Sequence, residues 1–216
     1  MEQKLHTPEG VRDIYNKECE TKLALQRKLS KVLHLYGYQD IQTPTFEYYE
    51  VFRKEIGSTS TQELYKFFDR EGNILALRPD ITPSVARAAA TLFESEDMPI
   101  RLCYAGNTFI NHSSYQGRLK ENTQLGAELI GLDSVEADAE MLAMVADSLK
   151  QIGLQEFQIS LGHVDFIRSL LKAAGLGEEE SREIRALITN RNFFGIEEIL
   201  DAHEVKESVK EAFRLL

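Results

Sequence analysis

The sequence predicts an α+β fold in which an antiparallel sheet is flanked by helices. Short apolar segments near residues 38, 64, 74, 100, 122 and 156 have the composition of strands. Short loops join most of them, and only a few long helical segments lie between. The sequence lacks the strict strand–helix alternation of a doubly wound sheet, and it has no Gly-x-Gly-x-x-Gly or Walker loop.

The first quarter of the chain is predicted to hold a long helix, a strand and an aromatic segment. Apolar residues recur at helical spacing over residues 14–36, and Gly37 is placed to end that helix. Residues 38–43 are predicted to form a short strand. A second helix, ending near Gly57, is expected to carry an aromatic cluster of Phe46, Tyr48, Tyr49 and Phe52. We interpret this cluster as core or subunit interface rather than as a ligand cage.

The next segment is predicted to be a hairpin followed by a turn and a helix. Residues 64–69 and 74–77 are the expected hairpin strands. Thr82 followed by Pro83 fits a helix N-cap with proline at the first helical position, and the alanine-rich helix is expected over residues 84–93.

The most informative feature is a pair of segments, 104–110 and 117–131, that predict two antiparallel strands joined by a polar loop. The second strand alternates, so that one face carries Gln124, Gly126 and Glu128 and the other carries Leu125, Ala127 and Leu129. An amide and a carboxylate on one sheet face can grip a small cationic or amide-bearing ligand. The missing side chain of Gly126 is expected to leave room for that ligand.

The C-terminal part is predicted to change from mixed structure to helices alone. Asp133 or Ser134 is expected to cap a helix running to Gln151, and residues 156–161 are expected to form a strand. Residues 1–162 are therefore assigned to a sheet domain and 163–216 to a helical subdomain packed on it. The expected helices of that subdomain are 163–174, 178–189, 192–201 and 203–215.

Two details of the helical subdomain are predicted from its glycines and aromatic residues. Gly195 is expected to interrupt the third helix. Residues 190–194, Asn-Arg-Asn-Phe-Phe, are interpreted as a helix-joining turn with buried rings, and a partner site is the alternative.

Four residues are expected to converge on one pocket. Asp80 and Thr82 come from the turn before the alanine-rich helix, and Gln124 and Glu128 come from one face of a strand. The two carboxylates would attract an α-ammonium or an imidazolium through charge-assisted hydrogen bonds, and Thr82 and Gln124 would orient it. For Asp80 or Thr82 taken alone, a capping or solvated polar group is the favoured interpretation.

Composition excludes several classes of protein. The formal net charge of −10, with no dense Lys/Arg run, argues against a nucleic-acid surface. Cys19 and Cys103 make no disulfide framework, which favours a reducing cytoplasm, and both are expected to be small core residues. The five histidines are scattered, so we expect no zinc site and no cofactor. The sequence has no apolar run of transmembrane length and no signal-peptide pattern at Met1.

These motifs resemble the histidyl-tRNA synthetase-like branch of the class II aminoacyl-tRNA synthetases. The resemblance covers about the first three quarters of the chain, through Thr7–Asp13, Gly37–Glu47, Leu77–Thr82, the paired strands and Glu136–Glu140, and also Leu161–Phe166. It implies a class II catalytic-domain fold. It also implies that the residues matching Asp80 and Thr82 contact the histidine ammonium, and that those matching Gln124 and Glu128 line the amino-acid pocket.

One departure from the synthetase pattern argues against catalysis. Synthetases have Phe-Arg-x-Glu where this chain has Phe109-Ile-Asn-His112, so Ile110 replaces the arginine that neutralises the substrate carboxylate and the ATP phosphate. Losing that arginine should cost several orders of magnitude in rate. The turn Arg78–Pro83 is more similar to the ATP phosphoribosyltransferase regulatory subunits, which are synthetase paralogues without aminoacylation machinery.

That second resemblance implies a non-catalytic subunit with no catalytic residues of its own. Its implied partner is a short-form ATP phosphoribosyltransferase catalytic subunit in the first step of histidine biosynthesis, with histidine as the effector. A homodimer within a hetero-oligomer is implied, with no nucleic acid and no membrane. Family members are longer than 216 residues, so we expect a chain truncated at its C-terminus. The alternatives are a divergent histidyl-tRNA synthetase catalytic fragment and a dimerisation module with a vestigial pocket.

Overall fold

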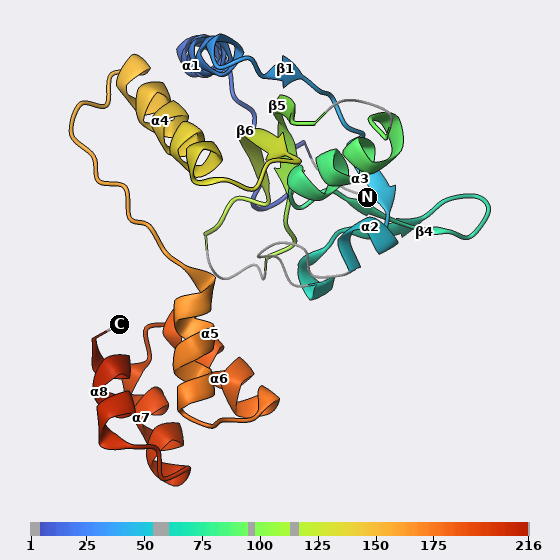
Figure 1. The fold of residues 1–216 in the computed structure, drawn as a ribbon. Coiled ribbons are helices and arrows are strands. Elements are labelled where there is room, and N and C mark those ends of the chain that lie inside the picture. The colour runs from blue at the N-terminus through green and yellow to red at the C-terminus, as the bar shows by residue number, and fades with distance from the viewer. Residues whose placement is uncertain (1–4, 54–60, 95–97, 113–116, 216) are drawn as a thin grey trace. The chain divides into compact units, whose positions relative to one another are not determined.

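The computed structural model describes residues 5–53, 61–94, 98–112 and 117–215 (Figure 1). The chain divides into two compact units, Met1–Glu156 and Phe157–Leu216. None of the described helices has both the length and the apolar character needed to cross a bilayer.

The first unit mixes helices and strands, and the predicted fold class is confirmed. Its elements in chain order are α1 (Asn16–Leu35), β1 (Gln39–Asp40), β2 (Phe46–Tyr48), α2 (Glu50–Arg53), a 3-10 turn η1 (Thr61–Glu63), β3 (Lys66–Phe68), β4 (Ile74–Leu77), α3 (Thr82–Leu92), β5 (Ile100–Phe109), β6 (Glu121–Ile130) and α4 (Val135–Gln151).

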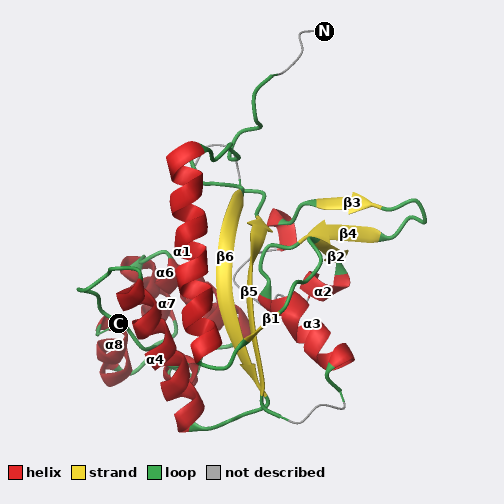
Figure 2. Cartoon of the chain, turned by 90° about the horizontal axis from the view of Figure 1, so that it is seen from above, coloured by secondary structure: helices red, strands yellow, loops and turns green. Residues whose placement is uncertain are grey.

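The longest feature of the first unit is the antiparallel ladder of β5 and β6, which Figure 2 shows as two long adjacent arrows. It runs without a break from the pair Ile100–Ile130 to the pair Phe109–Glu121. The short β1 adds a parallel pairing to β5, with Asp40 opposite Cys103. The predicted antiparallel strand pair is therefore confirmed, and the sheet also contains one parallel pair.

The alternation predicted for β6 is confirmed by what each face contacts. The even-numbered face of the ladder, with Leu102 and Tyr104, packs on Ile81 and Val85 at the start of α3. On the odd-numbered face, the core residues include Leu33 of α1, Cys103 of β5 and Met144 of α4, and Leu125, Ala127 and Leu129 pack against them. Helices thus cover both faces of the ladder.

A second, smaller sheet has the strand order β2-β4-β3 and is antiparallel throughout. The predicted hairpin is confirmed as β3 and β4, but the helix predicted for the aromatic cluster is wrong in its first part. Phe46 and Tyr48 lie in β2, because pairing to β4 overrides the helical spacing of the rings. Phe52 lies in α2 and is buried, and the predicted helix end near Gly57 lies outside the described residues.

Several element ends differ from their predictions. α1 ends as predicted before Gly37, whose φ of +85° favours glycine, and Ser134 caps α4 by accepting from the Ala137 N–H. β1 is shorter than the predicted strand. The N-cap of α3 is Ile81 rather than Thr82, which is already helical and turns its hydroxyl elsewhere. The strand predicted at 156–161 is wrong, since these residues pair with no described strand.

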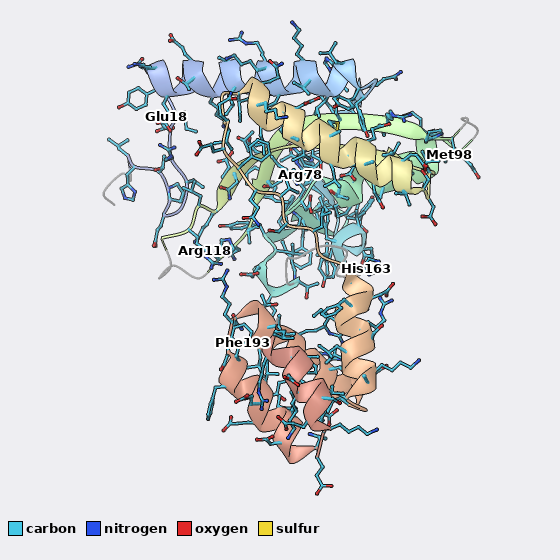
Figure 3. All side chains as sticks on the ribbon, turned by 60° about the vertical axis from the view of Figure 1, so that its left-hand side comes forward. Glu18, Arg78, Met98, Arg118, His163 and Phe193 are labelled. Atoms are coloured by element: carbon cyan, nitrogen blue, oxygen red, sulfur yellow. The ribbon has the colours of Figure 1, made fainter. Side chains whose placement is uncertain are left out.

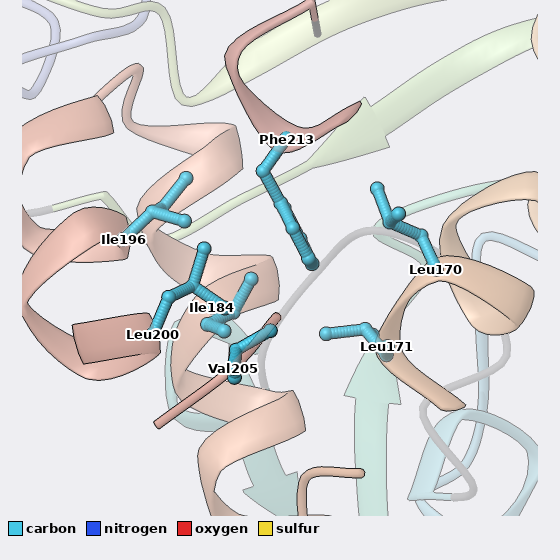
Figure 4. Packing of buried hydrophobic residues seen from close by; sticks show 7 residues of the cluster. All are labelled: Leu170, Leu171, Ile184, Ile196, Leu200, Val205 and Phe213. Carbon is cyan, nitrogen blue, oxygen red and sulfur yellow. The ribbon is translucent and has the colours of Figure 1, made fainter. Parts of the chain in front are cut away.

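The described residues of the second unit form helices only, as predicted: α5 (Val164–Ala173), α6 (Glu178–Thr189), α7 (Phe193–Ala202) and α8 (Glu207–Arg214). Figure 4 shows their shared core, which consists of Leu170, Leu171, Ile184, Ile196, Leu200, Val205 and Phe213. At 0% exposure Ile184 is fully enclosed. The unit therefore has a hydrophobic core of its own.

Two predictions about α7 are wrong. Gly195 does not interrupt the helix, because the Asn192 side chain caps the N-terminus by accepting from the Gly195 N–H. The rings of Phe193 and Phe194 are exposed, although Asn190–Asn192 do form the predicted turn. Ile196 and Leu200 instead occupy the positions of α7 that face the hydrophobic core.

Candidate functional site

The four predicted site residues are brought together in one hydrogen-bonded network, which we call the cradle (Asp80, Thr82, Gln124 and Glu128). Asp80 lies in the turn before α3, and its Oδ1 accepts from the Thr82 N–H at 3.1 Å and from Gln124 Nε2 at 3.0 Å. The Ile81 N–H donates to Gln124 Oε1 at 3.1 Å. The amide of Gln124 thereby ties β6 to the turn.

The other half of the cradle joins the first turn of α3 to the same face of β6. The Thr82 hydroxyl donates to Glu128 Oε1 at 2.7 Å. Tyr104 donates to the same oxygen at 3.1 Å, and its hydroxyl lies 3.3 Å from that of Thr82. Three side chains from α3, β5 and β6 therefore meet at one carboxylate oxygen.

The room predicted above Gly126 is not empty, so that prediction is wrong. Gly126 pairs with Tyr104 across the ladder, and a Cβ at Gly126 would lie 2.5 Å from the Tyr104 hydroxyl oxygen. The glycine is needed because the phenol ring lies over it. Sequence reasoning missed Tyr104, although a tyrosine of β5 on the same face as the cradle, opposite a glycine, could have identified it.

Tyr104 is held as a neutral donor. Burial is the main cause that raises the pKa of its hydroxyl, and the negative charges of Glu128 and Asp80 raise that pKa further. The residue is buried, and its hydroxyl has carboxylate and threonine partners. It therefore fixes the orientation of Glu128 rather than acting as a base.

Each carboxylate of the cradle has one oxygen to which the described residues donate no hydrogen bond. The hydrogen bonds of the described residues use Oδ1 of Asp80 and Oε1 of Glu128, and they do not reach Oδ2 or Oε2. The four residues of the cradle are half-buried. Two carboxylates with unused acceptors in a partly desolvated place favour a cationic group.

Within the described part of the chain, no lysine or arginine forms an ion pair with the cradle. Ile110 follows β5 and donates its N–H to the Lys120 carbonyl, while the Lys120 side chain lies against Gly10. Arg78, labelled in Figure 3, is buried and donates to the carbonyl oxygens of Asn107, Thr43 and Pro44. Arg78 therefore braces the backbone beneath the turn.

A cavity of about 400 Å³ lies away from the cradle and does not include it. Its lining includes Asn107, Glu121 and Thr123, which occupy the odd-numbered face of the ladder, together with Arg12 and Lys22. Asn107 links the other two by donating to Glu121 at 2.7 Å and accepting from Thr123 at 2.9 Å. This cavity therefore adds nothing to the four residues predicted as the site.

Residues 10–216 match the family model described as histidyl-tRNA synthetase. The chain belongs to that family. It is 42% identical to a protein of Acetivibrio thermocellus named ATP phosphoribosyltransferase regulatory subunit, over 97% of this chain and 50% of that protein. It spans about half the length of the curated relatives it matches. The predicted resemblance to these regulatory subunits is confirmed.

Solved structures of the family agree with the fold. A Bacillus halodurans protein, described as an ATP phosphoribosyltransferase regulatory subunit/histidyl-tRNA synthetase, superposes with a TM-score of 0.87 at 32% identity. The match covers 97% of this chain and 54% of that one. A histidine–tRNA ligase subunit of Alicyclobacillus acidocaldarius gives 0.82 at 27% identity, covering 96% and 60%. The class II fold predicted from the motifs is confirmed.

The raised pKa of Tyr104 predicts a loss of stability in alkali. The folded pKa lies above the unfolded value of about 10, so the folded state holds the proton more tightly. The contribution is complete below about pH 10 and is lost as the pH rises further. Tyr104→Phe should flatten the fall of the unfolding free energy above about pH 10, measured by urea titration. Tyr15→Phe, at a residue 71% exposed, should leave this pH dependence unchanged. Equal slopes of the unfolding free energy against pH in both variants would contradict this account.

Proposed function

We propose that this chain acts as a non-catalytic regulatory subunit of ATP phosphoribosyltransferase, binding histidine in the cradle and associating with the short catalytic subunit in the first step of histidine biosynthesis. The observation that carries the proposal is the hydrogen-bonded cradle itself, whose two carboxylates are paired with no described cation. Relatives named as these regulatory subunits support it.

Histidine fits the chemistry of the cradle at both ends of the ligand. Its α-ammonium offers three donors, which suit the unused oxygens of Asp80 and Glu128. Its imidazole can donate to or accept from the amide of Gln124. The Arg78 guanidinium lies over Gly106, on the same ladder face, but its hydrogen bonds go to the backbone carbonyls of Asn107, Thr43 and Pro44.

Adenylate chemistry is disfavoured by the same arrangement. A carboxylate and a phosphate that approach each other must be neutralised by preorganised cations. Ile110 supplies none, and Lys120 points its side chain along Gly10. The cradle is therefore suited to holding an amino acid and unsuited to activating it, which favours a sensor over a divergent synthetase fragment.

Regulation requires that histidine bind one state of the complex better than another. The cradle joins the turn before α3 to β6, so a ligand that draws Asp80 and Glu128 together biases the position of α3. Reciprocity then demands that the catalytic subunit change the affinity for histidine.

A homodimer is proposed through the outer face of the β2-β4-β3 sheet. Phe46 and Tyr48 alternate onto this face, and they are 50% and 57% exposed. Phe67 of β3 meets Phe46 edge to face, with ring centroids 5.6 Å apart. Neighbouring exposed rings of this kind are typical of a protein interface.

Histidine binding to this chain should depend on the charge of Glu128. Glu128→Gln removes a charge-assisted hydrogen bond worth about 1.5–3 kcal/mol, so the Kd from calorimetry should rise at least about tenfold. Glu121→Gln is the matched control, since it lies on the same strand but on the opposite face, bonded to Asn107. Equal Kd values would contradict the cradle, and histidine-driven ATP–pyrophosphate exchange would support the synthetase alternative.

The dimer face can be tested by adding a charge to it. Phe46→Asp should convert a dimer to a monomer in light-scattering mass measurements, because a carboxylate would be buried without a partner. Phe68→Asp is the control, since Phe68 is also exposed but its side chain points to the other face of the same sheet. A wild-type chain that is monomeric at every concentration would exclude this dimer.

Association with the catalytic subunit should be separable from histidine sensing. Co-expression with a short-form ATP phosphoribosyltransferase chain should yield a complex by size-exclusion chromatography, with histidine inhibiting its activity. The Glu128→Gln complex should form equally well and need about tenfold more histidine for the same inhibition. Failure of the two chains to co-elute would refute the partner, whatever the result of calorimetry.

A further inference from the structure

We propose that His34, Asp40 and Cys103 form a binding site for a zinc-like divalent cation, which we call the metal triad. It lies on the odd-numbered face of the ladder and shares no residue with the cradle. The expectation of no metal site rested on sequence spacing, and this triad joins residues 63 positions apart.

Three neighbouring elements place the triad. His34 lies in the last turn of α1, and the tight link through Gly37 brings the chain directly into β1. Asp40 on β1 is the register partner of Cys103 on β5, so their side chains leave the sheet on the same face. The buried residues Leu33, Tyr38 and Met144 pack around Cys103 and hold these elements together.

The ligand atoms lie near the separations that a tetrahedral ion needs, and the two short contacts use different oxygens of Asp40. His34 Nε2 lies 3.1 Å from Asp40 Oδ2, and Cys103 Sγ lies 3.5 Å from Asp40 Oδ1. Zinc bond lengths give tetrahedral edges of about 3.3 Å between nitrogen and oxygen and about 3.6 Å between sulfur and oxygen. One ligand atom from each residue lies within 4.8 Å of the other two. Small side-chain adjustments therefore suffice to close the site.

The ligand set selects the kind of ion. A thiolate, an imidazole and a carboxylate suit the borderline-soft Zn²⁺ and its analogue Co²⁺ better than Mg²⁺ or Ca²⁺, which take oxygen ligands. Cys103 is 1% exposed and anchors the inner side, while the side chains of His34 and Asp40 are 46% and 68% exposed. Three protein ligands leave a fourth position open on the solvent side. Binding replaces the Cys103 thiol proton, which passes to solvent.

A simple ion pair competes with this interpretation. His34 near the C-terminus of α1 would interact favourably with Asp40 without any metal, and the Cys103 thiol would donate a hydrogen bond to Asp40 Oδ1. The two interpretations differ in the role of the sulfur atom, because only a metal site requires the Cys103 thiolate as a ligand.

Cobalt titration tests the site directly. The protein purified after chelator treatment should bind about one Co²⁺ per chain and develop thiolate-to-cobalt charge-transfer absorption. Zn²⁺ should displace the cobalt and abolish that absorption. Exposed-site variants His34→Gln and Asp40→Asn should raise the Co²⁺ Kd at least about tenfold, as expected for the loss of a direct ligand.

Controls separate loss of the site from loss of the fold. Cys103→Ser should remove the charge-transfer absorption while retaining the circular dichroism of the native chain. Cys19→Ser and His112→Gln should behave like the wild type; His112 pairs with Glu63 at 3.1 Å and reproduces the His34–Asp40 contact without a thiol. The proposal is overturned if Co²⁺ shows no thiolate absorption, or if His34→Gln and His112→Gln bind it equally. Zn²⁺ protection of Cys103 from alkylation gives a second measurement, and unchanged labelling would count against the site.

Discussion

The register of the β5–β6 ladder is the constraint on which both proposed sites depend. Ten consecutive pairs fix which side chains face α3 and which face α1 and α4. A slip by one residue would exchange the faces, moving Glu128 into the apolar side and Leu129 into the cradle. The pairing of Tyr104 with Gly126 helps to exclude such a slip, because only glycine leaves space for the phenol ring. One close contact thus secures the position of the whole polar network.

The fold could be predicted from the sequence wherever local periodicity decides which face of an element a side chain occupies. The faces of β6 and the end of α1 at Gly37 follow from local patterns. The convergence of the four cradle residues was predicted from the family resemblance of two distant segments, and the structure joins those residues by direct hydrogen bonds. The failures arose where partners distant in the sequence decide the outcome. Phe46 and Tyr48 follow β4 into a sheet, and Tyr104 fills the space above Gly126. The His34–Asp40–Cys103 contact depends on a parallel pairing that no spacing rule identifies.

The electrostatics of the cradle support the proposal that an amino acid binds there without being activated. Two carboxylates beside a neutral tyrosine, with no cation of the described residues paired to them, favour positive charge over phosphate. Aminoacyl activation needs the reverse at its reacting end, since the developing charge there is negative. The carboxylates that disfavour the negatively charged ATP also favour binding of an ammonium group. The proposed feedback role therefore follows from what the site attracts as much as from what it lacks.

The hydrogen bonds already formed within the cradle determine which groups of a ligand it can bind. Thr82, Tyr104 and Gln124 already donate to the carboxylates, so a ligand gains little by replacing those bonds. It gains most by adding donors to the oxygens that are still unused. An α-ammonium does this without displacing any protein donor, whereas a neutral ligand with one donor can satisfy only one carboxylate. Discrimination then rests on charge and donor count rather than on shape. This suits a sensor, whose signal must come from differential affinity between states and whose pocket must release its ligand intact.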